Sequence, residues 1–151
     1  MIAQASASLI GEIEAFYVHY LDRFRAGDSA ALAGMAVRPM ARIGADAVSL
    51  VDTPPDPAAL KARTGWHDTV EVDVTVLDAT PARAHLRLNR AVRVRADGSA
   101  IETIAGFYAL VRQDGAWKIL AVSVVATPVK EKARSFLKKR TKKLRSYVEL
   151  C

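Results

Sequence analysis

The sequence predicts an α+β fold in which three helices in the first half of the chain cover one face of an antiparallel sheet. Three observations support this prediction. Residues 6–26 repeat apolar side chains at steps of three and four, which is the spacing of one helix face. From residue 70 onward, apolar residues recur at every second position, which is the spacing of one face of a strand. Asp-Gly pairs at 97–98 and 114–115 then divide this part into hairpins.

Start and stop signals define one long helix and two short ones in the first half. Gly27 suits the end of a helix, and Asp28 suits the cap of the next. Asp56, which precedes a proline, suits the cap of a third. The three helices are expected over residues 6–26, 29–35 and 57–63. Residues 40–43 and 48–51 predict a small hairpin between the second and third helices.

The second half predicts four antiparallel strands that follow one another as a meander. They are expected over residues 70–76, 84–95, 101–112 and 117–126. The third of them is apolar on both faces and is therefore expected in the middle of the sheet. The sequence contains no internal repeat and no sign of a second globular domain.

The charge of the chain is concentrated at its C-terminal end. Residues 129–151 contain nine lysines and arginines and two acidic residues, whereas residues 1–128 contain 13 basic and 14 acidic residues. Apolar residues return to helical spacing in this basic segment. We therefore expect a nearly neutral domain over 1–128 and a basic amphipathic helix over 129–151.

Composition also sets expectations about location and metal chemistry. The 151 residues fit one domain, and no apolar run approaches the ~18 residues that a membrane span needs. The N-terminus lacks the basic start and apolar block of a signal peptide. Cys151 is the only cysteine, and no element has metal-ligand spacing. A cytoplasmic protein without a metal is expected.

Two segments resemble the nuclear-transport-factor-two-like superfamily. They are YLDRFRAGD, which begins at residue 20, and VRVRADGSAIETIAGFYALVRQDGAWKIL, which begins at residue 92. The resemblance covers residues 6–126 and is closest to small bacterial members of unassigned function. The superfamily includes ketosteroid isomerases, scytalone dehydratase and polyketide cyclases of the SnoaL type. The resemblance implies a cone-shaped curved sheet wrapped on the long helix and the two short helices, as in a cystatin-like roll.

The same resemblance implies a pocket and a dimer. The cone of these proteins encloses an apolar cavity at its open end, and members commonly dimerise through the outer face of the sheet. We expect the pocket here to be lined by Tyr17, Tyr20, Trp66 and Phe107. A small apolar molecule is the expected partner, and a second copy of the chain is expected on the outer sheet face.

Tyr20 is the first candidate for chemistry. It is similar to the isomerase tyrosine that donates a hydrogen bond to a developing oxyanion. Those isomerases also use a carboxylate base and a protonated acid. Asp46 and Asp52 lie in the region that matches the base, but the third long strand has no matching acid. The alternative is that Tyr17 and Tyr20 are core aromatics with satisfied hydroxyls.

His67 is the second candidate, because it lies between the third helix and the first long strand, at the expected mouth of the cone. A histidine there can act as a general base near neutral pH. His85 is expected on the outer face of the sheet together with Arg83, Arg87 and Arg93. Those arginines either form cross-strand pairs with acidic residues, bind an anionic ligand or contribute to the dimer contact.

Three functions remain open from the sequence. The first is a small-molecule-binding protein with an apolar pocket. The second is an isomerase, dehydratase or cyclase that needs no cofactor and uses Tyr20 with His67 or an aspartate such as Asp52. The third is an interaction module whose basic C-terminal helix contacts an anionic surface. The sequence carries no motif for specific nucleic-acid binding.

Overall fold

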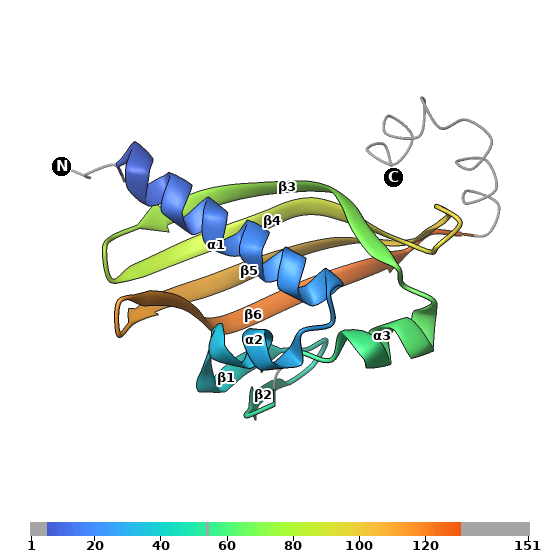
Figure 1. Ribbon diagram of the computed structural model, residues 1–151, viewed down its shortest axis with the longest axis horizontal. Helices are drawn as coiled ribbons and strands as arrows, with labels where there is room; N and C mark the ends of the chain where they lie inside the picture. The colour runs from blue at the N-terminus through green and yellow to red at the C-terminus, as the bar shows by residue number, and fades with distance from the viewer. Residues whose placement is uncertain (1–5, 54, 131–151) are drawn as a thin grey trace.

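A computed structural model describes residues 6–53 and 55–130, which form a curved sheet with a long helix across one face (Figure 1). This confirms the predicted α+β class and the curved sheet wrapped on the first helix. The helices are α1 (Ala7–Arg25), α2 (Ser29–Gly34) and α3 (Pro57–Thr64). The strands are β1 (Ala36–Ile43), β2 (Val48–Val51), β3 (Asp68–Ala79), β4 (Arg83–Val94), β5 (Ala100–Gln113) and β6 (Ala116–Pro128). The predicted basic helix lies outside the described residues from position 131 onward.

Polar caps fix where each helix begins. Ser6, Asp28 and Asp56 each accept a hydrogen bond from the amide three residues ahead, at 3.2, 3.1 and 3.0 Å. Gly27 and Gly65 follow α1 and α3 with positive φ angles of 68° and 78°, which glycine adopts without a steric penalty. The predicted caps at Asp28 and Asp56 are therefore confirmed.

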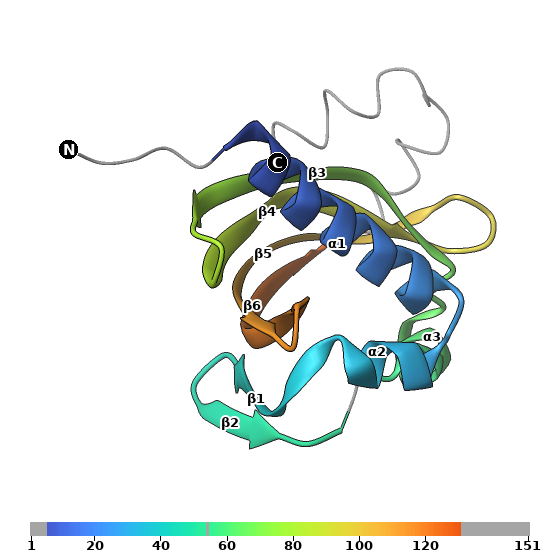
Figure 2. The ribbon, with the colours of Figure 1, turned by 60° about the vertical axis from the view of Figure 1, so that its left-hand side comes forward.

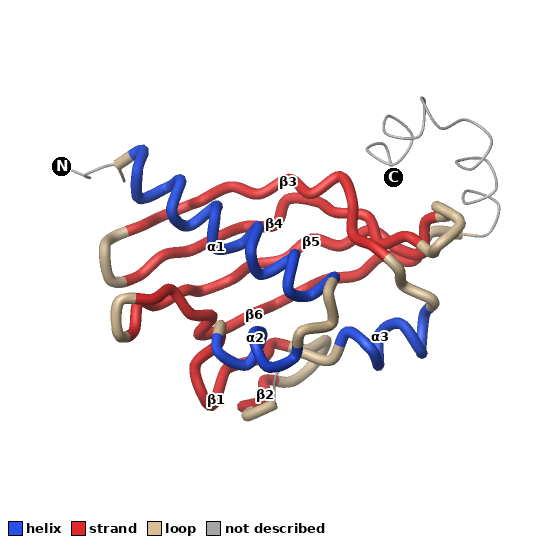
Figure 3. The backbone as a smooth tube through the Cα atoms, in the orientation of Figure 1, coloured by secondary structure: helices blue, strands red, loops and turns tan. Residues whose placement is uncertain are grey.

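The strands form one sheet in the order β2-β1-β6-β5-β4-β3 (Figure 3). The third long strand, β5, lies between β4 and β6, as its apolar faces predict. The pairing is antiparallel except between β1 and β6, which run parallel. The expectation of a wholly antiparallel sheet is wrong at this pair, because alternation along a strand specifies a face and not the direction of its neighbour.

Strand β1 begins four residues earlier than the sequence predicts and includes Pro39. Its pairing with β6 is interrupted between Ala36 and Ala41, and Pro39 lies in this interval. A proline lacks the amide proton that a ladder needs, so an irregular stretch is where a strand tolerates it. The proline therefore lies at a break in the ladder between β1 and β6.

Helix α1 is attached to the sheet at both ends (Figure 2). Near its start, Glu12 accepts a 2.8 Å hydrogen bond from the indole of Trp117 and also pairs with Arg112. Near its end, Arg25 donates to Asp68 at 2.7 Å and to the carbonyl of Thr69 at 2.6 Å. These contacts fix the angle at which α1 crosses the sheet.

Strand β4 reverses the facing of its side chains at a bulge. Between Leu88 and Ala91, two residues of β4 stand opposite a single residue of β5. Even-numbered positions face the core up to Leu88, and odd-numbered positions do so from Ala91, which is fully buried. The prediction that Arg93 shares the outer face with His85 is therefore wrong, and Arg93 lies on the inner face.

The contact between β5 and β6 is close at Gly106. A Cβ atom there would lie 2.9 Å from the carbonyl oxygen of Ser123 and 3.1 Å from a methyl carbon of Val124. We expect Gly106→Ala to lower the free energy of unfolding by about 1–3 kcal/mol, because the strands must move apart. Urea denaturation at neutral pH measures the change.

A glycine in open space provides the control for this substitution. At Gly11, within α1, an added Cβ would meet nothing within 4 Å. Gly11→Ala is expected to stabilise the protein by up to about 1 kcal/mol, because alanine favours the helix. Equal stability of Gly106→Ala and the unaltered protein would contradict the close approach of β5 and β6.

The outer face of the sheet carries apolar side chains in contact with solvent. Phe107 is 37% exposed and Val125 is 66% exposed. The dimer contact on this face stays a prediction.

No helix within residues 6–53 and 55–130 is long and apolar enough to cross a membrane.

Candidate functional site

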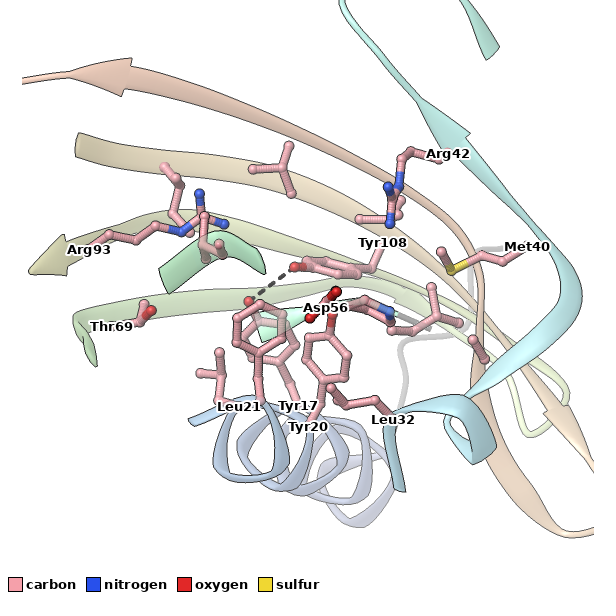
Figure 4. Close-up of a pocket in the computed structure, with 18 of the residues that line it drawn as sticks. Tyr17, Tyr20, Leu21, Leu32, Met40, Arg42, Asp56, Thr69, Arg93 and Tyr108 are labelled. Carbon is pink, nitrogen blue, oxygen red and sulfur yellow. Dashed lines mark hydrogen bonds between the residues drawn. The ribbon is translucent and has the colours of Figure 1, made fainter. Parts of the chain in front are cut away.

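A cavity of about 450 Å³ lies between α1 and the concave face of the sheet (Figure 4). Its walls come from all three helices and from strands β1, β3, β4, β5 and β6. Much of the wall is apolar. Its larger apolar side chains are Leu21, Phe24, Leu32, Met40, Ile43, Leu60, Ile104, Ile119, Val122 and Val124. This size, with an apolar wall and a few polar groups, is typical of sites for small molecules.

Three tyrosines meet on the cavity wall. Tyr17 and Tyr20 lie three residues apart on α1 and so share one helix face, and Tyr108 reaches them from β5. The hydroxyls of Tyr17 and Tyr108 are 3.3 Å apart and form a hydrogen bond. The three ring centroids are separated by 5.2–6.2 Å, within the range of favourable aromatic contacts. We call Tyr17, Tyr20 and Tyr108 the tyrosine cluster.

The tyrosine cluster stays protonated at neutral pH. Burial raises the pKa of Tyr17 to about 12, and the hydrogen bond with Tyr108 opposes this rise only in part. Burial also raises the pKa values of Tyr20 and Tyr108 well above the ordinary value of about 10. All three groups therefore present O–H bonds and not phenolates to the interior of the cone.

Arginines give the polar part of the cavity a positive charge. Arg93 enters from β4 with its side chain 19% exposed, and it donates to Glu102 at 2.5 Å. Arg42 reaches the wall from β1 and is an exposed residue, and its side chain forms neither an ion pair nor a hydrogen bond with another described residue. Figure 4 shows these two guanidinium groups on different sides of Tyr108. Their charges favour ionisation of the tyrosine cluster, but burial outweighs them.

Acidic groups are scarce on the cavity wall. Among the described lining residues, Asp56 is the one carboxylate, and one of its oxygens already accepts the Ala59 amide as the cap of α3. In the described ranges, no three histidine, cysteine, aspartate or glutamate side chains are close enough together to hold a metal ion. The polar part of the wall therefore consists mainly of hydroxyl and guanidinium groups, with a single, partly engaged carboxylate.

The structure places two of the four predicted pocket residues on the cavity wall and two elsewhere. Tyr17 and Tyr20 line the cavity. Phe107 lies on the outer face, where the centroid of its ring is 5.2 Å from the centroid of the His85 imidazole. Trp66 is buried behind the wall, and its ring centroid is 5.2 Å from that of Phe24. The structure therefore places Trp66 and Phe107 away from the wall of this cavity.

The predicted acid–base partners are not brought to the tyrosine cluster. His67 is exposed, and its backbone amide donates to the carbonyl of Val94 at the entrance to β3. Asp52 is exposed beyond the end of β2. Neither side chain lines the 450 Å³ cavity. Of the three residues considered for catalysis, Tyr20 alone lies on its wall.

Sequence reasoning missed Tyr108 and Arg42 as cavity residues and placed Arg93 on the outer face. In β5, Phe107 and Tyr108 are adjacent, so only one of them can face inward. The pairing of Leu86 with Tyr108 identifies the inward residue, but it lies beyond two register shifts, one between Arg93 and Val94 and one at the bulge in β4. Arg93 is turned inward by the same bulge. No signal in the sequence indicates where the bulge lies.

The sequence matches the family described as "NTF2-like protein (DUF6841)" over residues 11–127. The chain therefore belongs to this NTF2-like family, which confirms the resemblance. A search among curated proteins finds no match.

Solved structures with this fold include proteins of several labels. Aln2 from a Streptomyces species is 19% identical, with a TM-score of 0.61, and the match covers 92% of this chain and 99% of that one. An NTF2-like protein of unknown function from Pseudomonas putida is 17% identical, with a TM-score of 0.60 and coverage of 85% and 93%. A putative scytalone dehydratase from Novosphingobium aromaticivorans is 15% identical, with a TM-score of 0.57 and coverage of 77% and 82%. At these identities the likeness concerns the fold.

Proposed function

We propose that this protein binds a small, largely apolar molecule inside the cone. The observation that carries the proposal is the cavity of about 450 Å³ between α1 and the sheet, with apolar walls and a polar group of tyrosines and arginines. Burial of an apolar ligand against such walls is favourable by roughly 25 cal/mol per Å² of apolar surface removed from water. The polar groups would then orient the molecule.

Binding is the function that the geometry supports better than catalysis. Proton-transfer chemistry of the isomerase kind needs a base within hydrogen-bond reach of the substrate. The carboxylate among the described lining residues, Asp56, already caps α3, and His67 lies outside the cavity. The tyrosine cluster can donate hydrogen bonds to a ligand without performing a reaction.

Filling the cavity tests this proposal. The probe is N-phenyl-1-naphthylamine, a neutral aromatic compound whose fluorescence rises in an apolar environment. Val122 lines the cavity from β6, so Val122→Trp places an indole where the probe would lie. We expect this variant to bind the probe at least about tenfold more weakly, which corresponds to about 1.4 kcal/mol.

A tryptophan on the opposite face of the same strand is the control. Val125 is 66% exposed and does not line the cavity. Val125→Trp adds the same side chain outside the cone and should leave probe affinity within about twofold. Thermal unfolding of both variants verifies that they are folded. Equal affinity of Val122→Trp and Val125→Trp, or no binding to the unaltered protein, would overturn the proposal.

A further inference from the structure

The polar part of the cavity has more hydrogen-bond donors than its own residues can satisfy. In the bond between Tyr17 and Tyr108 one hydroxyl donates to the other, so the accepting tyrosine keeps a free O–H proton. The hydroxyl of Tyr20 forms no hydrogen bond with another described residue, although the residue is only 8% exposed. Buried donors normally find an acceptor, because leaving one unpaired is costly. A molecule that brings acceptor oxygens would complete this wall.

The charge of the wall has the same implication. Arg42, Arg63 and Arg93 line the cavity, against the single carboxylate of Asp56 among the described lining residues. Arg93 is already paired with Glu102, whereas Arg42 has no such partner among the described residues. Arg42 and Tyr20 both line the cavity, and the charge of Arg42 acts on Tyr20 more strongly than that of Arg93 does. An uncompensated guanidinium beside protonated phenols favours an oxygen anion.

We infer that the molecule bound in the cone has an apolar body and an anionic oxygen group, such as a carboxylate, held by Arg42 and Tyr20. This inference rests on the proposed function and specifies the chemical class of its ligand. The apolar body lies against the aliphatic wall from β5 and β6. The free proton of the Tyr17–Tyr108 pair is available to a second acceptor atom of the same molecule.

Two probes with the same aromatic body separate the anionic contribution from the apolar one. They are 1-anilinonaphthalene-8-sulfonate and N-phenyl-1-naphthylamine, which differ by the sulfonate. We expect the sulfonate probe to bind at least about tenfold more tightly, because hydrogen bonds to charged groups are the stronger class. Only fluorescence that Val122→Trp abolishes is counted, which excludes binding to apolar patches on the surface.

Substitution of Arg42 tests the assigned contact. Arg42→Gln should lower the affinity for the sulfonate probe by about fivefold to twentyfold. It should change the affinity for the neutral probe by less than about twofold. Arg42→Lys keeps the charge and should retain a substantial part of the affinity. Arg87→Gln removes the same charge from an exposed position opposite Phe107 on the outer face and should change neither probe.

The outcomes distinguish the inference from the function on which it rests. If both probes bind equally, or if Arg42→Gln and Arg87→Gln have the same effect, the anionic ligand class is wrong. Binding of the neutral probe that is sensitive to Val122→Trp would still support the proposed function in that case. If neither probe enters the cavity, both proposals fall.

Discussion

Raising the pH above about 10 is expected to unfold this protein over a narrow interval. The cause is the tyrosine cluster, whose members are 2%, 8% and 5% exposed. In the unfolded chain a tyrosine loses its proton near pH 10. In the folded protein burial holds the pKa of Tyr17 at about 12 and those of Tyr20 and Tyr108 well above the ordinary value. Alkaline solution therefore favours the unfolded chain, in which all three phenols can ionise.

The direction follows from which state binds more protons. Below about pH 10 both states keep the phenolic protons, so the contribution to stability is fully present. As the pH rises further, the unfolded chain releases protons that the folded chain retains, and stability falls until the folded pKa values are passed. Two pKa units at Tyr17 correspond to about 3 kcal/mol. The total free energy of unfolding of a folded domain is only about 5–15 kcal/mol.

Urea denaturation at a series of pH values between about 8 and 11.5 measures this loss, and tyrosinate absorbance is followed in parallel. Tyr17→Phe is the informative variant. It should cost about 1 kcal/mol near neutral pH, because the hydrogen bond with Tyr108 is lost. Above pH 10 the free energy of unfolding of Tyr17→Phe should fall less steeply than that of the unaltered protein. The difference between the two slopes should be up to about 1.4 kcal/mol per pH unit, because one titrating group has been removed. Ionisation of the cluster near pH 10 in the folded protein would contradict the prediction.

Ile13→Ala is expected to destabilise the protein by about 3 kcal/mol. Ile13 lies in the middle of α1, is fully buried and belongs to the main core between the helix and the sheet. Truncation of a fully buried isoleucine removes apolar burial and leaves a cavity, and such changes cost about 2–5 kcal/mol. A loss of this size lowers the melting temperature by roughly 10 °C in a domain of this length.

The same helix provides the control. Val18 is 57% exposed, so Val18→Ala should change stability by no more than about 0.5 kcal/mol. Calorimetry or urea denaturation of the two variants gives the comparison. Because α1 also carries Tyr17 and Tyr20, loosening the helix at Ile13 should also lower the affinity for the neutral probe, N-phenyl-1-naphthylamine. Similar melting temperatures for the two variants would show that α1 is not held to the sheet through Ile13.

Much of the fold could be predicted because local chemistry specifies it. The caps Asp28 and Asp56 and the Asp-Gly turn at 97–98 act over a few residues, and the structure uses them as the sequence indicates. The parallel pairing of β1 with β6 could not be predicted in this way. It depends on how a strand far from β6 in the sequence approaches it in space, and alternation carries no such information.

The site was harder to predict than the fold, because its composition depends on register. Tyr17 and Tyr20 could be found since they follow the helical spacing of α1. The register beside the Asp97-Gly98 turn pairs Val94 with Ala100, and continued without a shift it would set Phe107 opposite Arg87. The structure arrives at the same partner through two shifts that cancel, one between Arg93 and Val94 and one between Leu88 and Ala91. The bulge at 89–90 nevertheless affects the composition of the site, because Arg93 faces inward beyond it although Leu88 also faces inward.

The bulge also gives β4 one place where the chain can shorten without altering the cavity. Loss of one residue at 89–90 would leave a single residue opposite Ala105, and Leu88 and Arg93 would both still face inward. The same loss elsewhere in the strand would exchange inner and outer side chains on one side of the gap. Among relatives of this protein, a one-residue gap at 89–90 is therefore compatible with an unchanged ligand, whereas a gap at another point of β4 marks a cavity with a different lining.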